Sequence, residues 1–270
     1  TNLRPSAIRK RGLTYEGLRR FNPKLVCVAL TGYGLEGEHA ERPAYDYVIQ
    51  AITGVMSITG DPDAPPTKTG YSAVDNSAGI MAAMGLLAKI VEGQGGQVDV
   101  AMFDVMMSQL NYLAGASLNA AEPAKRHANS SHPYIVPAQL FRASDGWVML
   151  FITHDEFWRK FCTEAGRDAW LADERFSTMA ARTRNRDVVL GAIAELIATD
   201  SAARWVARLA PLGIVVSCVE SLEHALASEL AAARRMVVEL PCDGARLRAV
   251  GAAVKFDGAQ PAFGEPPLLG

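Results

Sequence analysis

The run of apolar residues at 25–30, LVCVAL, places the strongest constraint on the fold of this chain. It follows Asn22-Pro23 and precedes the glycine-containing loop 31–37, so it has the length and the boundaries of a strand. Because polar and apolar residues do not alternate within it, the run predicts a strand that is covered on both faces, as in a parallel sheet. We therefore expect helices to lie close to this strand in the sequence.

The elements around this strand predict a large α/β domain over residues 1–121. Helical periodicity covers 45–57, and a helix rich in Ala, Met and Leu is expected over 76–92. Between them, Pro62, Pro65 and Pro66 predict a loop over 60–70, the proline loop. Residues 97–102 alternate as a second strand, and a further helix is expected over 104–119. An order of strand, helix, helix, strand and helix indicates crossover connections and an α/β layer.

The second half of the chain predicts a different organisation. Residues 122–137 are polar and contain prolines, so we interpret them as a linker. A smaller α+β domain is expected over 138–213, beginning with a hairpin that turns at Ser144-Asp145-Gly146. We expect residues 214–270 to return to the large domain.

Composition disfavours several classes of function. The 270 residues include 27 Lys and Arg and 29 Asp and Glu, for a net charge of −2, which predicts no nucleic-acid partner and no membrane surface. The four cysteines and five histidines show no ligand spacing, so neither a disulfide framework nor a metal site is expected. With no uninterrupted apolar run of membrane-spanning length and no signal peptide, we expect a cytoplasmic protein.

The loop 32–37, GYGLEG, matches the pattern G-x-G-x-x-G and follows a strand. The dinucleotide-binding fingerprint also needs a helix that begins at the third glycine, because the N-terminus of that helix holds the pyrophosphate. Here charged residues and Pro43 follow instead. A nicotinamide-dependent oxidoreductase is therefore disfavoured, and we interpret the segment as a loop able to border a ligand.

Asp75 stands at the start of the helix expected over 76–92, and two interpretations are open. An Asp before Asn-Ser-Ala-Gly is a common N-cap. A carboxylate in that position is also stabilised as an anion by backbone N–H groups, and an ionised carboxylate is what a covalent nucleophile requires. The small residues around it leave room for another molecule; they are Ser72, Ala73, Ser77, Ala78 and Gly79.

Short motifs occur in a fixed order along the chain. They are Asn2-Leu3-Arg4-Pro5, Asn22-Pro23-Lys24-Leu25-Val26, Thr31-Gly32-Tyr33-Gly34, Arg42-Pro43-Ala44-Tyr45-Asp46, Gly60-Asp61 with Pro65-Pro66, Gly95-Gly96-Gln97-Val98-Asp99-Val100 and His132-Pro133. Each motif is weak alone, but their order and spacing resemble those of the family III CoA-transferases, the CaiB/BaiF family. The resemblance covers essentially the whole chain.

The resemblance implies a Rossmann-like large domain with a smaller α+β domain inserted into it, and a homodimer in which the two chains interlock. It also implies further segments before residue 1 and after residue 270. The expected substrates are an acyl-CoA and a carboxylic acid, with coenzyme A as co-substrate, no tightly bound cofactor and no metal.

In that family the nucleophile is an Asp between the proline loop and the following helix, and Asp75 matches this position. The resemblance implies that CoA passes between carboxylic acids through a covalent aspartyl intermediate. The implied CoA- or substrate-binding residues are Lys10, Arg11, Gly32, Tyr33, Gly34, Tyr45 and Asp46.

Tyr45 separates two activities found on this fold. The related α-methylacyl-CoA racemases have His immediately before Asp, where this chain has Tyr45-Asp46. The substitution favours CoA transfer over proton transfer at the α-carbon. A racemase-like acyl-CoA enzyme, and a truncated, non-catalytic member of the family, are the alternatives.

Overall fold

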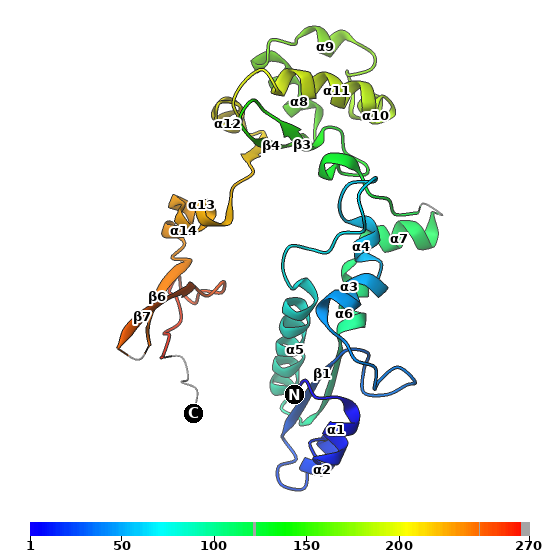
Figure 1. Ribbon diagram of the computed structural model, residues 1–270, viewed down its shortest axis with the longest axis vertical. Coiled ribbons are helices and arrows are strands. Elements are labelled where there is room, and N and C mark those ends of the chain that lie inside the picture. Colours follow the sequence, from blue (N-terminus) through cyan, green and yellow to red (C-terminus); the bar gives the residue numbers. More distant parts are fainter. Residues whose placement is uncertain (121–122, 243, 266–270) are drawn as a thin grey trace. The chain divides into compact units, whose positions relative to one another are not determined.

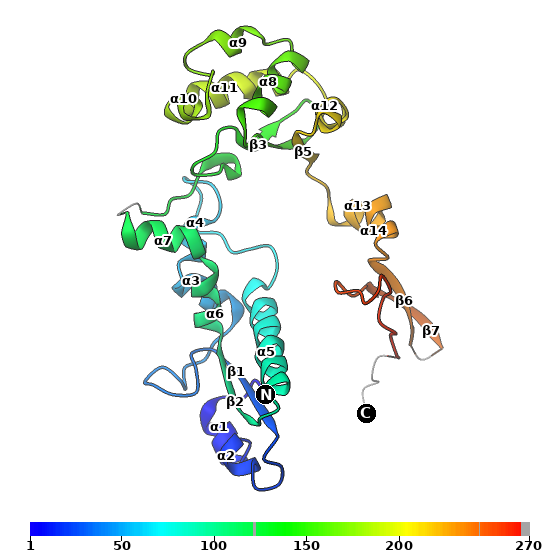
Figure 2. The ribbon, with the colours of Figure 1, turned by 180° about the vertical axis from the view of Figure 1, so that it is seen from behind.

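The computed structural model describes residues 1–120, 123–242 and 244–265 (Figures 1 and 2). The chain divides into two compact units, Thr1–Pro133 and Tyr134–Gly270, and each unit has its own hydrophobic core. The division falls within the segment 122–137 that the sequence predicts to be a linker.

The first unit is built on two parallel strands, β1 (Val26–Thr31) and β2 (Gly96–Ala101). Both strands and their parallel pairing were expected from the sequence, and their register aligns Val28 with Val98. The helix α5 (Ala73–Glu92) contacts both strands, as Figure 1 shows for β1. The connection between the strands therefore crosses over the sheet through helices.

The other helices of this unit are short. They are α1 (Pro5–Lys10), α2 (Tyr15–Leu18), α3 (Asp46–Ile52), α4 (Val55–Ile58), α6 (Met102–Gln109) and α7 (Asn111–Asn119), with the 3-10 turn η1 (Ala128–Ser130) after them. The helix expected over 45–57 divides into α3 and α4 because Gly54 takes a left-handed conformation with φ of 84°. The helix expected over 104–119 divides at Asn111, which also has a positive φ.

Helix α5 leaves much of its apolar surface uncovered in this unit. Ile80, Met84, Leu87 and Val91 are all more than half exposed. By length and composition α5 is the one helix among the described residues that is able to span a membrane. Its contacts with the sheet, α3 and α6 place it in a packed α/β layer.

The second unit contains a three-stranded antiparallel sheet in the order β3 (Ala138–Arg142), β4 (Trp147–Phe151) and β5 (Val215–Cys218). The hairpin of β3 and β4 confirms the prediction at 138–152. Helices cover this sheet; they are α8 (Asp155–Glu164), α9 (Ala169–Ala172), α10 (Met179–Arg184), α11 (Arg186–Ile197), α12 (Ala202–Leu209) and the 3-10 turn η2 (Ala210–Leu212).

The sequence predicts that the smaller domain ends at residue 213, and this boundary is wrong for the strand that follows it. Val215–Cys218 pairs with β4, so β5 completes the sheet of the second unit. The remaining elements of the chain are α13 (Leu222–Ala227), α14 (Glu229–Ala233) and the antiparallel pair β6 (Val237–Cys242) and β7 (Ala245–Val250). That these residues return to the large domain stays a prediction.

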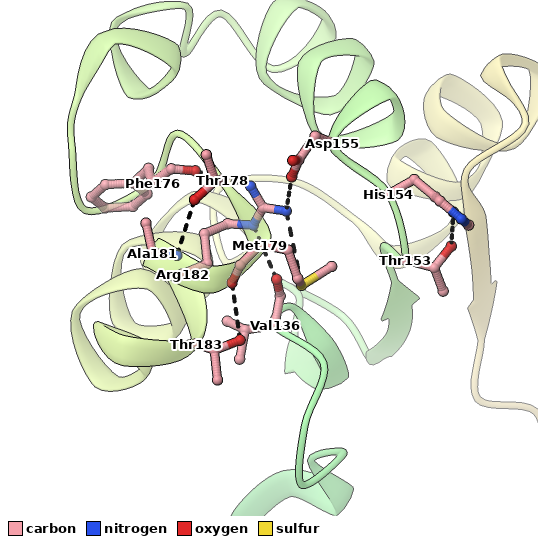
Figure 3. A network of polar contacts seen from close by, with 10 residues as sticks. All are labelled: Val136, Thr153, His154, Asp155, Phe176, Thr178, Met179, Ala181, Arg182 and Thr183. Carbon is pink, nitrogen blue, oxygen red and sulfur yellow. Dashed lines mark hydrogen bonds and ion pairs between the residues drawn. The ribbon is translucent and has the colours of Figure 1, made fainter.

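A buried arginine joins several parts of the second unit (Figure 3). Arg182 is fully buried and donates hydrogen bonds to the carbonyl oxygens of Val136 at 3.1 Å and Phe176 at 3.0 Å. It also forms an ion pair with Asp155 at 2.8 Å, and its guanidinium carbon lies 4.7 Å from the centre of the Trp158 ring. The charge is thus fully partnered, which is the condition for burying an arginine.

Candidate active site

A cavity of about 550 Å³ opens in the first unit at the carboxyl ends of β1 and β2. Leu30, Thr31 and Gly32 line it where β1 ends, and Met102 lines it directly after β2. This edge of a parallel sheet is where α/β proteins place their ligands. The remaining lining comes from residues 2–5, the segment 40–45 and Asp75.

Asp75 is the third residue of α5, so the interpretation of Asp75 as an N-cap is wrong. The helix begins at Ala73, three residues earlier than predicted, and Ser72 occupies the cap position without a side-chain hydrogen bond. The side chain of Asp75 is exposed and lines the cavity. It is therefore accessible to a molecule that binds there.

The start of α5 is capped instead by Asp46, the first residue of α3. One carboxylate oxygen of Asp46 accepts hydrogen bonds from the backbone N–H of Val74 at 2.8 Å and of Asp75 at 3.2 Å. The other oxygen accepts a bond from the side chain of Gln50. Asp46 is only 5% exposed and is not among the residues that line the cavity. The structure therefore gives this predicted substrate-binding residue a supporting position.

This arrangement changes the expected electrostatics of Asp75. Partial burial, and secondly the negative charge of Asp46, raise the pKa of the Asp75 carboxyl above its usual range. Sequence reasoning predicts the opposite, because the N–H groups at a helix start stabilise a carboxylate. Here the N–H groups of Val74 and Asp75 donate to Asp46, so they are not available to the Asp75 side chain.

Two arginines that sequence reasoning missed also line the cavity. They are Arg4, immediately before α1, and Arg42, in the loop before α3. Arg42 lies 5.6 Å from the centre of the Tyr33 ring, which helps to orient its guanidinium group. The sequence offered a signal for both arginines, because each immediately precedes a proline in one of the motifs that resemble the family. Together they place positive charge in the cavity that holds Asp75.

The other predicted residues divide between the cavity and its surroundings. Gly32 and Tyr45 line the cavity, and Tyr45 is 77% exposed. Tyr33 lies beside Arg42 outside the lining, and the backbone N–H of Gly34 donates to the hydroxyl of Thr31 at 2.9 Å. This N–H is therefore used within the loop.

Lys10 and Arg11 do not line the cavity. Both are exposed at the carboxyl end of α1, whereas the residues preceding α1 contribute to the lining. A role for them in CoA binding stays a prediction. The loop 32–37 is followed by further loop and next by α3 at Asp46, so it lacks the helix that a dinucleotide-binding fingerprint requires.

The fold and the site thus define a mixed α/β protein in which an exposed carboxylate and two arginines line one cavity. The sequence model for CoA-transferase family III matches residues 1–270. The chain belongs to CoA-transferase family III.

Sequence similarity to known CoA-transferases supports this family assignment. The chain is 30% identical over 243 residues to an acetyl-CoA:oxalate CoA-transferase of Acetobacter aceti, covering 88% of this chain and 62% of the relative. It is 31% identical over 258 residues to a succinate–glutarate CoA-transferase of Agrobacterium fabrum, covering 90% of this chain and 61% of the relative. The chain thus spans about three fifths of the length of these curated relatives.

A solved structure also resembles the chain along most of its length. A CAIB/BAIF family protein from Brucella suis superimposes with a TM-score of 0.81 and 30% sequence identity. The superposition covers 96% of this chain and 68% of that protein. The mixed α/β fold predicted from the sequence is therefore confirmed.

Proposed function

We propose that this chain carries the nucleophile of an acyl-CoA:carboxylate CoA-transferase, and that Asp75 is that nucleophile. The observation that carries the proposal is the exposed carboxylate of Asp75 in the cavity at the carboxyl end of the parallel sheet. The relatives named above transfer CoA between small carboxylic acids, which agrees with this choice of substrate.

The reaction proceeds in two symmetrical halves. The Asp75 carboxylate attacks the acyl-CoA carbonyl carbon, the C–S bond breaks, and CoA leaves as a thiolate from a mixed anhydride. The thiolate then attacks the aspartyl carbonyl carbon of the anhydride, which releases the first carboxylate and leaves an aspartyl-CoA thioester. The acceptor carboxylate reverses these steps, so that it leaves as the new acyl-CoA and Asp75 is again a carboxylate.

Asp75 suits both halves of this reaction. Its raised pKa makes the ionised carboxylate a more basic, and so stronger, nucleophile than an ordinary Asp. Arg4 and Arg42 supply positive charge in the same cavity, where the substrates are carboxylates and the tetrahedral intermediates are oxyanions. Gly32 and Tyr45 complete the wall beside the reacting groups.

The wider organisation follows the family resemblance. The Rossmann-like large domain, the interlocked homodimer and the cytoplasmic location are part of the proposal, as is the use of coenzyme A as co-substrate without a tightly bound cofactor. The exposed apolar side chains of α5 support a partner surface. Lys10 and Arg11 remain candidates for the CoA phosphates, as exposed cations at the carboxyl end of α1.

Trapping of the covalent intermediate tests the proposal. The protein is incubated with succinyl-CoA and hydroxylamine, digested and analysed by mass spectrometry. Because hydroxylamine cleaves both the anhydride and the thioester, a hydroxamate is expected on Asp75. Asp75→Asn is expected to lose both the adduct and CoA transfer, whereas Asp187→Asn is the control, since Asp187 is an exposed acid in the first turn of α11 in the second unit.

Three outcomes would overturn the proposal. Full transfer activity in Asp75→Asn would exclude this nucleophile. Exchange of the α-proton in deuterated water without CoA transfer would favour the racemase-like alternative. Absence of transfer and of any adduct in the unchanged protein would favour a non-catalytic member of the family.

A further inference from the structure

A buried polar network connects the start of α5 to α3 and to the end of the proline loop. Asp46 accepts the N–H groups of Val74 and Asp75, and Gln50, one turn later on α3, donates its side-chain amide to Asp46. The side-chain oxygen of Gln50 accepts the backbone N–H of Thr69 at 2.9 Å. Asp46 and Gln50 are 5% and 0% exposed, so solvent does not compete for these bonds.

The network caps the N-terminus of α5 in place of a local N-cap side chain. An N-cap side chain accepts the N–H groups of the second or third helical residue, which here are Val74 and Asp75. Asp46 accepts both from a position 28 and 29 residues earlier in the sequence. The first turn of α5, and with it the backbone of Asp75, is therefore fixed relative to α3.

The same contacts bring the Asp46 carboxylate to within 3.2 Å of the Asp75 backbone nitrogen, so that two acidic residues share one helix terminus. Asp46 takes the favourable interaction with the helix N–H groups, whereas Asp75 is left with a negative neighbour. Acylation of Asp75 converts its charged carboxylate into a neutral anhydride or thioester. The repulsion between the two groups is then removed, so Asp46 favours formation of the covalent intermediate.

We propose that Asp46 is a positioning residue for Asp75: it fixes the first turn of α5 and supplies the negative charge that keeps Asp75 reactive and favours its acylation. The inference rests on the proposed role of Asp75 as nucleophile. Asp46 itself does not touch the substrate, because it is buried and is not among the cavity-lining residues.

Other charged or titratable groups near Asp75 are left unchanged by a substitution of Asp46. Arg4, Arg42 and Tyr45 line the same cavity, and Asp104 lies on α6, which packs against α5. The charge difference between the parent protein and the variant is therefore confined to position 46.

The test compares Asp46→Asn with Gln50→Met in the full chain. The Asn side chain has nearly the same shape and keeps an oxygen that is able to accept the N–H groups of α5, but it removes the charge. Asp46→Asn sets an amide N–H against the donating amide of Gln50, and Gln50→Met removes the hydrogen bonds of Gln50 to Asp46 and to the N–H of Thr69. Both variants therefore disturb the network, but only Asp46→Asn removes the charge. Comparison of the two variants separates the electrostatic effect from the structural one, and circular dichroism verifies that both are folded.

The first measurement does not depend on activity. Carbon-13 NMR of labelled aspartate carboxyl groups, with the Asp75 signal assigned by its loss in Asp75→Asn, follows the titration of Asp75. We expect the pKa of Asp75 to fall in Asp46→Asn and to change little in Gln50→Met. An unchanged titration of Asp75 in folded Asp46→Asn overturns the inference, whatever the enzyme's activity.

The second measurement is the steady-state rate of CoA transfer as a function of pH. In Asp46→Asn the acidic limb should move to lower pH, and kcat should fall on the order of tenfold with KM little changed. The yield of trapped Asp75 hydroxamate should fall in parallel. A rise in KM at constant kcat contradicts the inference, since it indicates lost binding.

The two proposals fail in distinguishable ways. If the pKa of Asp75 falls in Asp46→Asn but the unchanged protein gives no Asp75 adduct, the nucleophile assignment is wrong and the role inferred for Asp46 in catalysis falls with it. If the adduct forms and Asp46→Asn leaves both its yield and the titration of Asp75 unchanged, only the role of Asp46 is refuted.

Discussion

The contact between Gly32 and Ala44 provides a sharp test of how the cavity wall is packed. A Cβ atom added to Gly32 would lie 2.2 Å from the Cβ atom of Ala44, far inside the separation of about 3.5–4.0 Å at which carbon atoms make favourable contact. Both residues line the cavity beside Asp75. We therefore predict that Gly32→Ala forces the segment containing Ala44 to move by more than about 1 Å.

The expected cost follows from this overlap. Overpacking of this kind typically lowers the free energy of unfolding by about 1–3 kcal/mol. In the double variant Gly32→Ala/Ala44→Gly, the nearest remaining atom is the Cα of residue 44 at 3.7 Å, an ordinary contact. Through the conformational entropy of the unfolded chain, Gly→Ala stabilises and Ala→Gly destabilises the folded state by about 0.4–1 kcal/mol each, so the two effects nearly cancel. The double variant should therefore be as stable as the parent to within about 0.5 kcal/mol.

Urea unfolding of the parent, both single variants and the double variant, followed by circular dichroism, measures the interaction energy. CoA-transfer rates on the same four proteins should show the same pattern, with a loss in Gly32→Ala that is recovered in the double variant. The steric explanation is refuted if the change in unfolding free energy of the double variant equals the sum of the changes in the two single variants to within about 0.5 kcal/mol.

Three further predictions concern other buried or reactive groups. Arg182→Met should lower the free energy of unfolding by about 3–5 kcal/mol in urea titrations, because it leaves buried carbonyl oxygens unpaired, whereas the exposed Arg184→Met should have little effect. Burial raises the pKa of the Cys162 thiol to about 12, so iodoacetamide should alkylate the partly exposed Cys242 and spare Cys162 in the native protein. Asp75→Asn should raise the free energy of unfolding at neutral pH. The pKa of Asp75 is raised in the folded protein, so ionisation of this carboxyl destabilises the fold at a pH above that pKa. Asn removes the charge, and its stabilising effect should shrink in acid, where Asp75 is protonated.

Each of these predictions has a contrary outcome. Equal losses in Arg182→Met and Arg184→Met would show that the buried hydrogen bonds do not determine the stability of the second unit. Rapid alkylation of Cys162 without unfolding would contradict its burial. For Asp75→Asn, a lower urea midpoint than the parent at neutral pH would mean that the folded protein favours the ionised carboxylate.

Local pattern was sufficient to predict the parts of the fold that depend on neighbouring residues. The continuous apolar run predicted β1 and its parallel pairing, and the turn Ser144-Asp145-Gly146 predicted the hairpin of β3 and β4. The loop that precedes α5 was also predicted, since three prolines within a few residues exclude a helix.

The features that the sequence did not predict depend on contacts between distant residues. Asp75 resembled a cap because its neighbours are typical of one, but the capping carboxylate of Asp46 is supplied from 28 and 29 residues away. The strand at 215–218 belongs to the second unit because it pairs with β4, a partner far earlier in the chain. Arg4 and Arg42 are brought to one cavity by the fold alone.

The parallel pairing of β1 with β2 has a consequence for how the protein folds. The side chain of Gln97 donates a hydrogen bond to the carbonyl oxygen of Cys27, 70 residues earlier. The segment between these two residues contains α3, the proline loop and α5. Closing a loop of this length costs about 4 kcal/mol of chain entropy before native contacts compensate for it. We therefore expect formation of this non-local pairing to limit the folding rate of the first unit. The cavity around Asp75 is lined by residues at the ends of both strands, so a chain in which they have not paired does not hold Asp75 in this cavity.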